Sequence, residues 1–145
     1  DLVLALRPRV VSFHFGLPHP HQIAAMRAAG LVLLASATSL DEARQIREAG
    51  LDGVIAQGWE AGGHRGVFDP AAPDARLSTE DLTRALVREI PLPVIAAGGL
   101  MDGGDIRRAL SGARRRRNWA RPLSAARKAR PTRPIARDCR RGARR

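Results

Sequence analysis

Short runs of apolar and β-branched residues recur along the first three quarters of the chain, separated by stretches with helical spacing. Four such runs are predicted as strands and cover residues 10–15, 31–36, 53–57 and 92–97. None of them alternates strictly between apolar and polar positions, which is typical of strands that are covered on both faces. The pattern therefore predicts buried strands.

Helical stretches are predicted between and after these runs, at residues 22–29, 39–49, 78–89 and 105–110. Gly30 and Gly50 follow the first two stretches, as glycines often do at the carboxyl ends of helices. Ser39-Leu-Asp-Glu42 has the spacing of a capping box. In that motif the Ser39 hydroxyl accepts from the Glu42 amide, and the Glu42 carboxylate reaches back. Ser78-Thr-Glu-Asp81 predicts another helix start.

Strands that alternate with helices predict a parallel sheet, because parallel neighbours need a crossover connection that a helix supplies. The first three strands begin about 20 residues apart, which favours a (β/α)8 barrel, and such a barrel needs about 250 residues. The predicted fold class is therefore α/β, a partial TIM-type barrel of about four βα units. A half-barrel has two open sheet edges and an uncovered inner face, so we expect marginal stability or association unless the missing parts are supplied.

Charge divides the chain into two parts. Residues 1–112 carry 11 arginines against 13 acidic residues, whereas residues 113–145 carry 14 basic residues against Asp138 alone. The net charge of +11 therefore arises from the last 33 residues, in which arginine, alanine and proline dominate. This division predicts a folded domain over residues 1–112 and a disordered basic tail over residues 113–145.

Composition excludes several classes of protein. No stretch reaches the roughly 18 uncharged apolar residues of a membrane span, and the chain does not start like a signal peptide. One cysteine, Cys139, permits no internal disulfide and no cysteine-based zinc cluster. His19 and His21 lie close together, but without nearby acidic or cysteine ligands they predict a solvated loop and no metal site. We expect a soluble, cytoplasmic protein that does not bind membranes.

The strongest candidate for chemistry follows the third predicted strand, in Gln57-Gly-Trp-Glu-Ala-Gly-Gly-His-Arg-Gly66. In parallel α/β folds, functional side chains collect on the loops at the carboxyl ends of the strands. Gly62 and Gly63 carry no Cβ and let the backbone pass close to a flat or anionic ligand. A histidine titrates near neutral pH, so His64 can act as a base or hold an anion. An ordinary glycine turn with a surface histidine is the alternative.

A second candidate is the turn after the fourth predicted strand, where Gly98 and Gly99 precede a helix that begins near Asp105. Backbone N–H groups at such a strand-to-helix junction suit a phosphate, because unpaired amides and the helix dipole both favour an anion. A glycine-rich turn without a ligand is the alternative that these residues leave open.

Three segments, in this order and spacing, resemble the bacterial nitronate monooxygenases, formerly called 2-nitropropane dioxygenases. They are Val11-Ser-Phe-His-Phe-Gly-Leu-Pro18, Gln57-Gly-Trp-Glu-Ala-Gly-Gly-His-Arg-Gly66 and Pro93-Val-Ile-Ala-Ala-Gly-Gly99. The resemblance covers residues 1–112. It implies a TIM-type barrel that holds FMN without a covalent bond. It also implies an activity that oxidises alkyl nitronates with O2 to carbonyl compounds and nitrite.

The resemblance further implies roles for single residues. His64 falls on the family's active-site histidine. The implied cofactor contacts are Gln57 against the flavin, Gly62 and Gly63 along it, and Gly98 and Gly99 at its phosphate. A nitronate is already an anion, so His64 would attract and position it, or would first deprotonate a neutral nitroalkane. His14, at the end of an earlier strand, either lines the same mouth or is structural.

The resemblance stops at residue 112. The family continues with a strand ending in Gln-Leu-Gly-Thr-Ala that also contacts the FMN phosphate, whereas this chain has Arg114-Arg-Arg-Arg-Asn-Trp-Ala-Arg-Pro122. If these residues are encoded by CGG CGG CGG CGC AAC TGG GCA CGG CC, the frame that starts at the third base of Arg114 encodes Ala-Ala-Ala-Gln-Leu-Gly-Thr-Ala. We therefore hypothesise a fragment with a frameshift near residues 112–114, and we expect weak or no flavin binding.

Two other functions remain open at this point. A flavin-dependent enoyl-ACP reductase, a related barrel with a similar Gly-Gly-His loop, would reduce enoyl substrates with NAD(P)H. Non-specific binding of nucleic acid through the basic tail would weaken steeply with salt. The chain has only three Phe, two Trp and no Tyr on which bases could stack, so nucleic acid is the weaker alternative. The oligomeric state is left open.

Overall fold

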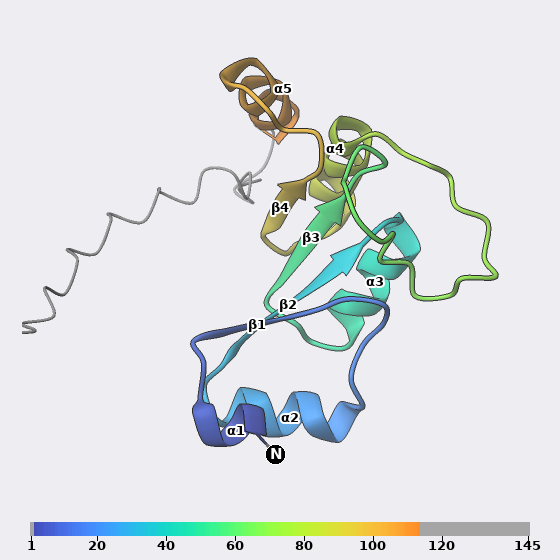
Figure 1. Cartoon of the computed structure of the whole chain (residues 1–145). Coiled ribbons are helices and arrows are strands. Elements are labelled where there is room, and N and C mark those ends of the chain that lie inside the picture. Colours follow the sequence, from blue (N-terminus) through green and yellow to red (C-terminus); the bar gives the residue numbers. More distant parts are fainter. Residues whose placement is uncertain (1, 114–145) are drawn as a thin grey trace, which may run out of the picture.

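The structure, a computed structural model, describes residues 2–113 as strictly alternating helices and strands (Figure 1). The strands are β1 (Val10–Phe13), β2 (Val32–Ala37), β3 (Gly53–Gln57) and β4 (Val94–Ala97). The helices are α1 (Leu2–Leu6), α2 (Pro20–Ala28), α3 (Leu40–Glu48), α4 (Thr79–Glu89) and α5 (Gly103–Ala113). Apart from Ala113, the predicted tail lies outside the described residues.

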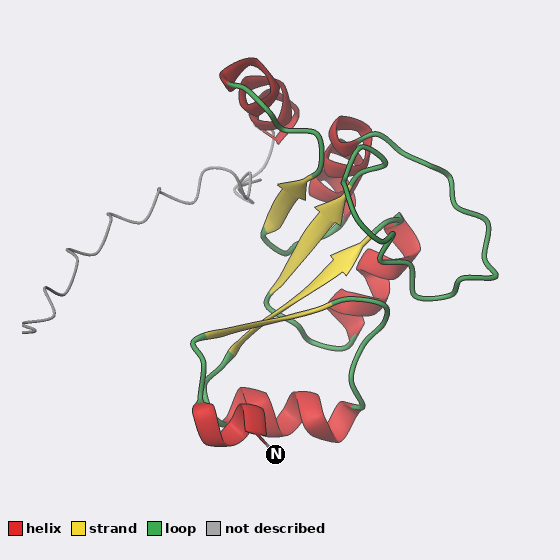
Figure 2. Ribbon diagram, in the orientation of Figure 1, coloured by secondary structure: helices red, strands yellow, loops and turns green. Residues whose placement is uncertain are grey.

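All four predicted strands are present, and β3 has the predicted bounds. The predicted helices are present as well, with α2, α3 and α4 beginning within two residues of the predicted starts. Helix α1 was not predicted, because Leu2–Leu6 is apolar throughout and offers no contrast between a polar and an apolar face. Figure 2 shows that each strand is followed by a helix.

The strands form one sheet in the order β1-β2-β3-β4, and every neighbouring pair is parallel. Val10 pairs with Val32, Leu34 with Gly53, and Val54 with Val94. The predicted parallel sheet is therefore confirmed. Because all four strands run in the same direction, their carboxyl ends meet at one edge of the sheet.

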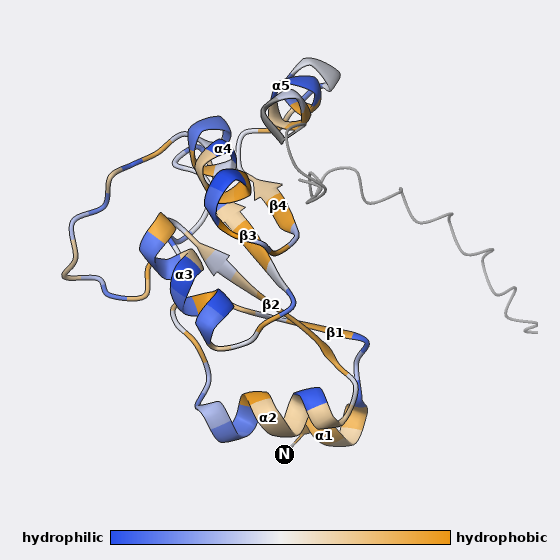
Figure 3. Cartoon of the chain, turned by 180° about the vertical axis from the view of Figure 1, so that it is seen from behind, coloured by the Kyte–Doolittle hydropathy of each residue, from blue (hydrophilic) through white to orange (hydrophobic). Residues whose placement is uncertain are grey.

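The helices cover one face of this sheet. Helix α2 packs on β2, α3 packs on β2 and β3, and α4 packs on β3 and β4. Alternate strand residues point toward these helices and are fully buried, namely Leu33, Ala35, Val54, Ala56, Val94 and Ala96. Ile46 of α3 and Leu86 of α4 are equally buried in the same core. Figure 3 shows the apolar strands and the polar outer turns of α3 and α4.

The opposite face carries no helix within residues 2–113 (Figure 1). Val10 is 51% exposed and Val32 is 43% exposed on this face. Helices therefore cover one side of the sheet only; on the other side the amino ends of β1 and β2 are open, whereas Ser36 and Ile55 are 2% and 7% exposed. No helix in this part of the chain is long and apolar enough to cross a membrane.

The capping box at the start of α3 forms only in part. Ser39 Oγ accepts from the Glu42 amide at 3.2 Å, as predicted. The Glu42 carboxylate, however, reaches one residue further back and accepts from Thr38 N at 2.5 Å and Thr38 Oγ1 at 2.8 Å. Its other oxygen accepts from Phe68 N at 2.8 Å, in the long connection between β3 and α4. Glu42 is 8% exposed and therefore joins that connection to the end of β2.

Glu42→Gln tests this junction. The amide keeps the shape of the side chain but places N–H groups where one of the backbone donors now finds an acceptor, so we expect a loss of about 1–3 kcal/mol in the free energy of unfolding. Glu48→Gln on the same helix is the matched control, because Glu48 is exposed and, within residues 2–113, pairs only with Arg47. Urea unfolding measures both. Equal losses in the two variants would contradict the role given to Glu42.

Candidate functional site

The carboxyl edge of the sheet brings together the predicted site residues. Gln57 ends β3 and opens the segment that contains His64, called here the histidine loop (residues 58–66). Gly98 and Gly99 follow β4 directly and begin the glycine turn (residues 98–102), which leads into α5. Both segments lie at the same edge because β3 and β4 are parallel neighbours.

Gln57 holds the histidine loop through both ends of its side-chain amide. Its Nε2 donates to the His64 carbonyl oxygen at 3.1 Å, and its Oε1 accepts from Gly66 N at 2.7 Å. Gly62, Gly63 and His64 themselves are exposed, and a Cβ on either glycine would meet open space. Among the described residues nothing bonds to the His64 imidazole. Gln57 therefore holds the loop backbone at His64 and Gly66, while Gly62, Gly63 and the His64 side chain are exposed to solvent.

Arg65 fixes the other side of the loop. Its Nε and Nη2 bind the two carboxylate oxygens of Asp74 at 2.7 and 3.1 Å, a bidentate ion pair. Its Nη1 donates to the Gln57 carbonyl oxygen at 2.5 Å, and its Nη2 also lies 3.5 Å from the Thr38 carbonyl oxygen. The Arg65 guanidinium thereby joins the ends of β2 and β3 to the connection that precedes α4. Sequence reasoning missed this role.

The ion pair sets the ionisation of Asp74. The bond from Arg65, more than that from the Arg76 backbone N–H, holds the pKa of the Asp74 carboxyl below its ordinary value. Both partners are partly buried, with side chains that are 19% and 20% exposed. Solvent therefore screens this pair less than it screens a fully exposed ion pair.

The glycine turn is packed directly against the histidine loop. Gly98 and Gly99 have φ values of +122° and +60°. A Cβ on Gly98 would lie 2.8 Å from Ala61 N, and one on Gly99 would lie 2.8 Å from Glu60 Cβ. Both positions therefore need glycine for conformation and for space. This close contact places the two predicted ligand segments side by side.

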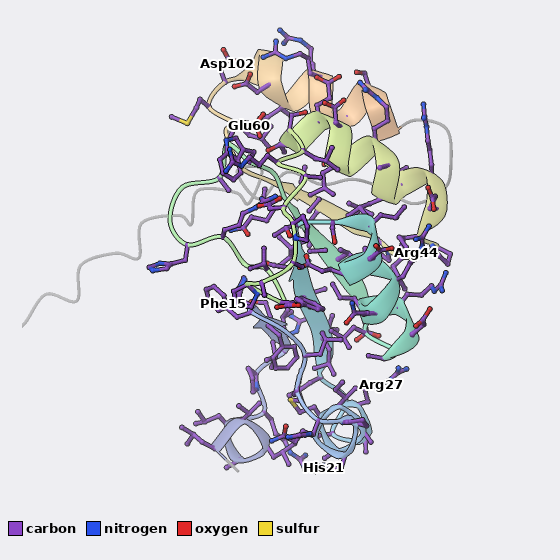
Figure 4. All side chains as sticks on the ribbon, turned by 90° about the vertical axis from the view of Figure 1, so that its right-hand side faces the viewer. Phe15, His21, Arg27, Arg44, Glu60 and Asp102 are labelled. Carbon is purple, nitrogen blue, oxygen red and sulfur yellow. The ribbon has the colours of Figure 1, made fainter. Side chains whose placement is uncertain are left out.

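Thr79, the first residue of α4, joins the two segments. Its Oγ1 lies 2.9 Å from the Gly98 carbonyl oxygen and 3.0 Å from Glu60 Oε2. The same Glu60 oxygen accepts from Thr79 N at 2.8 Å. Figure 4 shows Glu60 close to the start of α5, on the side of the molecule that carries Asp102. Nothing in the sequence pattern indicated this contact, since Thr79 and Glu60 are 19 residues apart.

The amino end of α5 is capped by the chain's own carboxylates. Asp102 Oδ1 accepts from Gly104 N at 2.6 Å and Asp105 N at 2.9 Å. Asp105 Oδ2 accepts from Met101 N at 2.8 Å and Asp102 N at 3.0 Å. These two backbone donors, Met101 first, hold the pKa of Asp105 below its ordinary value. The phosphate prediction relied on free N–H groups at this helix end, and two of them, those of Gly104 and Asp105, already donate to Asp102.

Other amides of the glycine turn are better placed for an anion. Within residues 2–113, no group accepts from the N–H of Gly99 or Leu100. A cavity of about 110 Å³ adjoins them and is lined in part by Glu60, Asp105 and Arg108. Arg108 offers a cation there, although it also pairs with Asp105. The turn therefore keeps backbone donors and one guanidinium for an anionic group, next to the three carboxylates of Glu60, Glu80 and Asp105.

The structure also places the three other histidines. His14 Nδ1 lies 2.8 Å from Ser36 Oγ, so the ends of β1 and β2 share a polar contact at the same edge. Ser36 is 2% exposed, whereas His14 is exposed. The loop predicted at His19 and His21 is wrong in part, because His19 directly precedes α2 and His21 lies in its first turn. Their rings stack with centroids 5.7 Å apart. No cluster of three potential metal ligands exists among the described residues, and the absence of a metal site stays a prediction.

Trp59 lies between two arginines at the start of the histidine loop. The Arg76 guanidinium lies 4.7 Å from the indole centroid and that of Arg65 lies 5.7 Å from it. The indole remains 49% exposed. Its ring contacts in the described structure are with these two guanidinium groups.

Comparison with known proteins identifies the family. Residues 1–114 match the sequence profile of the family described as nitronate monooxygenase. The chain belongs to this family. A nitronate monooxygenase from Paraburkholderia phytofirmans is 61% identical over 105 residues, which are 72% of this chain and 29% of that protein. The predicted membership is thereby confirmed, and the chain spans less than a third of the length of this relative.

Solved structures agree with this family and with the fold. The nitroalkane oxidase from Streptomyces ansochromogenes superposes with a TM-score of 0.75 at 40% identity, covering 84% of this chain and 35% of that one. FabK from Thermotoga maritima superposes with a TM-score of 0.65 at 30% identity, covering 83% and 34%. Residues 2–113 of this nitronate monooxygenase family member are therefore a partial TIM-type α/β unit, as predicted.

Asp74→Asn tests the ion pair through pH. Because the pKa of Asp74 is lowered in the folded state, its contribution to stability is fully present above about pH 4 and is lost as the pH falls through the lowered value. We expect the variant to be less stable than the parent at pH 7 and the difference to shrink in acid. Urea midpoints between pH 7 and pH 3 measure it. Asp69→Asn should show no such convergence, because the Asp69 side chain lies in the same connection and, among the described residues, accepts only from Ala71 N.

Proposed function

We propose that this chain carries part of the active site of an FMN-dependent nitronate monooxygenase, which oxidises alkyl nitronates with O2 to carbonyl compounds and nitrite. One observation carries the proposal: the histidine loop is packed on the glycine turn, with Gly98 against Ala61, at the carboxyl edge of a parallel sheet. The family membership supports the same reaction. The cytoplasmic location stays a prediction.

The exposed backbone of both segments suits a flavin. Gly62 and Gly63 have open space where a Cβ would stand, so a flat ring can approach the loop. Gly98 and Gly99 would hold the phosphate through the glycine turn, where the Gly99 amide is available and Arg108 is near. A bound FMN would supply the electron transfer from the nitronate to O2. The choice of FMN among flavins belongs to this proposal.

His64 would act on the substrate. Its imidazole is exposed on a loop whose backbone is fixed by Gln57, so it can move toward a ligand without disturbing the sheet. A protonated imidazole attracts the nitronate anion, and a neutral one removes the α-proton of a nitroalkane. Gln57 and Arg65 would serve as positioning residues, because both bind the backbone of the loop or of the strand before it.

A chimera tests the proposal, since this chain covers less than a third of its Paraburkholderia relative. Residues 1–112 replace the matching segment of that protein, and nitrite release from an alkyl nitronate is measured together with bound FMN. We expect the chimera to bind FMN and to release nitrite. His64→Ala should lower kcat/KM by at least about 100-fold, the usual size of an acid–base or electrostatic contribution. His21→Ala, on α2, is the matched control and should leave kcat/KM unchanged.

The outcomes separate the alternatives. A folded chimera that binds no flavin, or that retains full activity after His64→Ala, would contradict the proposed function. Reduction of an enoyl substrate with NAD(P)H, without nitrite release, would favour the enoyl reductase. Binding of the 145-residue chain to nucleic acid that vanishes on deletion of residues 113–145 would favour the third alternative.

Gln57→Ala in the chimera tests the base of the loop. The substitution removes both hydrogen bonds from the Gln57 side chain to the loop backbone, so His64 is no longer held in one position. We expect kcat/KM to fall about tenfold or more while FMN remains bound. Gln45→Ala is the control, because Gln45 is an exposed glutamine on α3. Loss of FMN from the Gln57 variant would instead indicate a direct flavin contact, as the family resemblance implies.

A further inference from the structure

Thr79 is the first residue of α4, and its side chain contacts both loops of the candidate site. The residue is 4% exposed. Helix α4 is fixed to the sheet by Leu82 and Leu86, which are fully buried in the core. The histidine loop and the glycine turn have no helix or strand of their own up to the start of α5. Thr79 is therefore a part of the packed core that reaches the two loops.

Two glycines leave the room that the Thr79 side chain occupies. A Cβ on Gly58, in the histidine loop, would overlap with Thr79 Oγ1 and with the Thr79 backbone. A Cβ on Gly98, in the glycine turn, would lie 2.9 Å from the same oxygen. A larger residue at either position would displace Thr79 or the loop. The hydroxyl group is therefore in close contact with both segments.

The polar contacts of Thr79 are made to these segments and are not needed to begin the helix. Ser78 Oγ already accepts from Asp81 N at 3.0 Å, which is the usual cap. Thr79 Oγ1 lies instead within hydrogen-bonding distance of the Glu60 carboxylate and of the Gly98 carbonyl oxygen. Thr79 N donates to the same carboxylate. Since Glu60 belongs to the histidine loop, these contacts join α4 to both loops.

Thr83 is the natural comparison for Thr79. It lies one turn further along α4 and is 1% exposed, yet its Oγ1 has no hydrogen-bond partner among the described residues. The hydroxyl group of Thr79 reaches two loops, whereas that of Thr83 makes no such contact. The two residues therefore separate the effect of a buried hydroxyl group from the effect of this particular contact.

We propose that Thr79 is a positioning residue for the proposed reaction. Its hydroxyl group holds the glycine turn against the histidine loop and so sets the place of the flavin phosphate relative to His64. The inference rests on the proposed function for the identity of the bound group. A displacement of about 1 Å far from the reacting atoms can lower a rate about 100-fold, so a contact that fixes both loops affects the reaction from a distance.

Thr79→Val in the chimera with the Paraburkholderia protein tests this role, because valine has the shape of threonine and no hydroxyl group. We expect the FMN dissociation constant to rise at least about tenfold, since the glycine turn is no longer held at Gly98. At saturating FMN, kcat should fall about tenfold while KM for the nitronate changes less than about twofold, because His64 itself is unchanged. Quenching of flavin fluorescence and nitrite release measure these constants.

Thr83→Val is the matched control. It removes a buried hydroxyl group from the same helix, but one without a partner in the described structure, so FMN affinity and kcat should equal those of the parent chimera. Thr79→Ser keeps the hydroxyl group and should leave both constants close to those of the parent. A Thr79→Val chimera that unfolds more readily but keeps the parent's FMN affinity and kcat would overturn the proposal. Equal losses in the two valine variants would overturn it as well.

Hydrogen exchange in the 145-residue chain tests the same contact without flavin. The Gly58 amide donates to the Ala97 carbonyl oxygen at 3.0 Å and the Ala61 amide to the Gly58 carbonyl oxygen at 3.2 Å, so both report on the packing of the histidine loop. Thr79→Val should speed exchange at these two amides and leave that of Val54, inside β3, at the parent's rate. Absence of FMN from the unsubstituted chimera would contradict the proposed function. Unchanged exchange at Gly58 and Ala61 would overturn the role of Thr79 even in an active chimera.

Discussion

Glu42 is a carboxylate with little solvent access that accepts hydrogen bonds from two segments 30 residues apart along the chain, at Thr38 and Phe68. The connection between β3 and α4 has no strand or helix of its own over residues 58–78, so its course depends on such contacts. Arg65 provides the second anchor through Asp74 and the Gln57 carbonyl oxygen. Because the histidine loop begins this connection, the position of His64 relative to the sheet depends on both charged groups. A polar network of this kind stabilises one arrangement only when each member is satisfied.

Local signals in the sequence were sufficient for the elements and for their order. Ser39 and Ser78 mark the starts of α3 and α4, and both accept the expected amide. The strands were found because β-branched runs are short and bounded by glycine or proline. Helix α1 escaped detection because its five residues lack a polar face. Parallel order then followed from the helical crossovers, and with it the edge of the sheet at which the candidate site lies.

The side-chain contacts that shape the site could not be predicted from local sequence signals. Glu42 was expected to cap the start of its own helix. Its carboxylate instead also accepts from Phe68 N, in the connection between β3 and α4, and this contact forms only once the connection is packed against the sheet. The link from Ser36 to His14 joins residues on neighbouring strands, and it depends on a register that no local pattern specifies. Asp102 and Asp105 satisfy the first turn of α5, where the sequence suggested free amides. The partners of Glu42 and Ser36 are decided by tertiary geometry, whereas Asp102 and Asp105 accept from backbone donors within four residues.

The Thr79 hydroxyl has a single hydrogen, yet two acceptors lie within bonding distance, the Glu60 carboxylate and the Gly98 carbonyl. At any instant one of them receives the hydrogen and the other does not. The histidine loop and the glycine turn are thus joined by a shared donor, and weakening one acceptor strengthens the bond to the other. Changes in the free energy of unfolding caused by altering the two acceptors one at a time will consequently not add up to the change caused by altering both. The sign of the difference shows which acceptor the Thr79 hydroxyl favours.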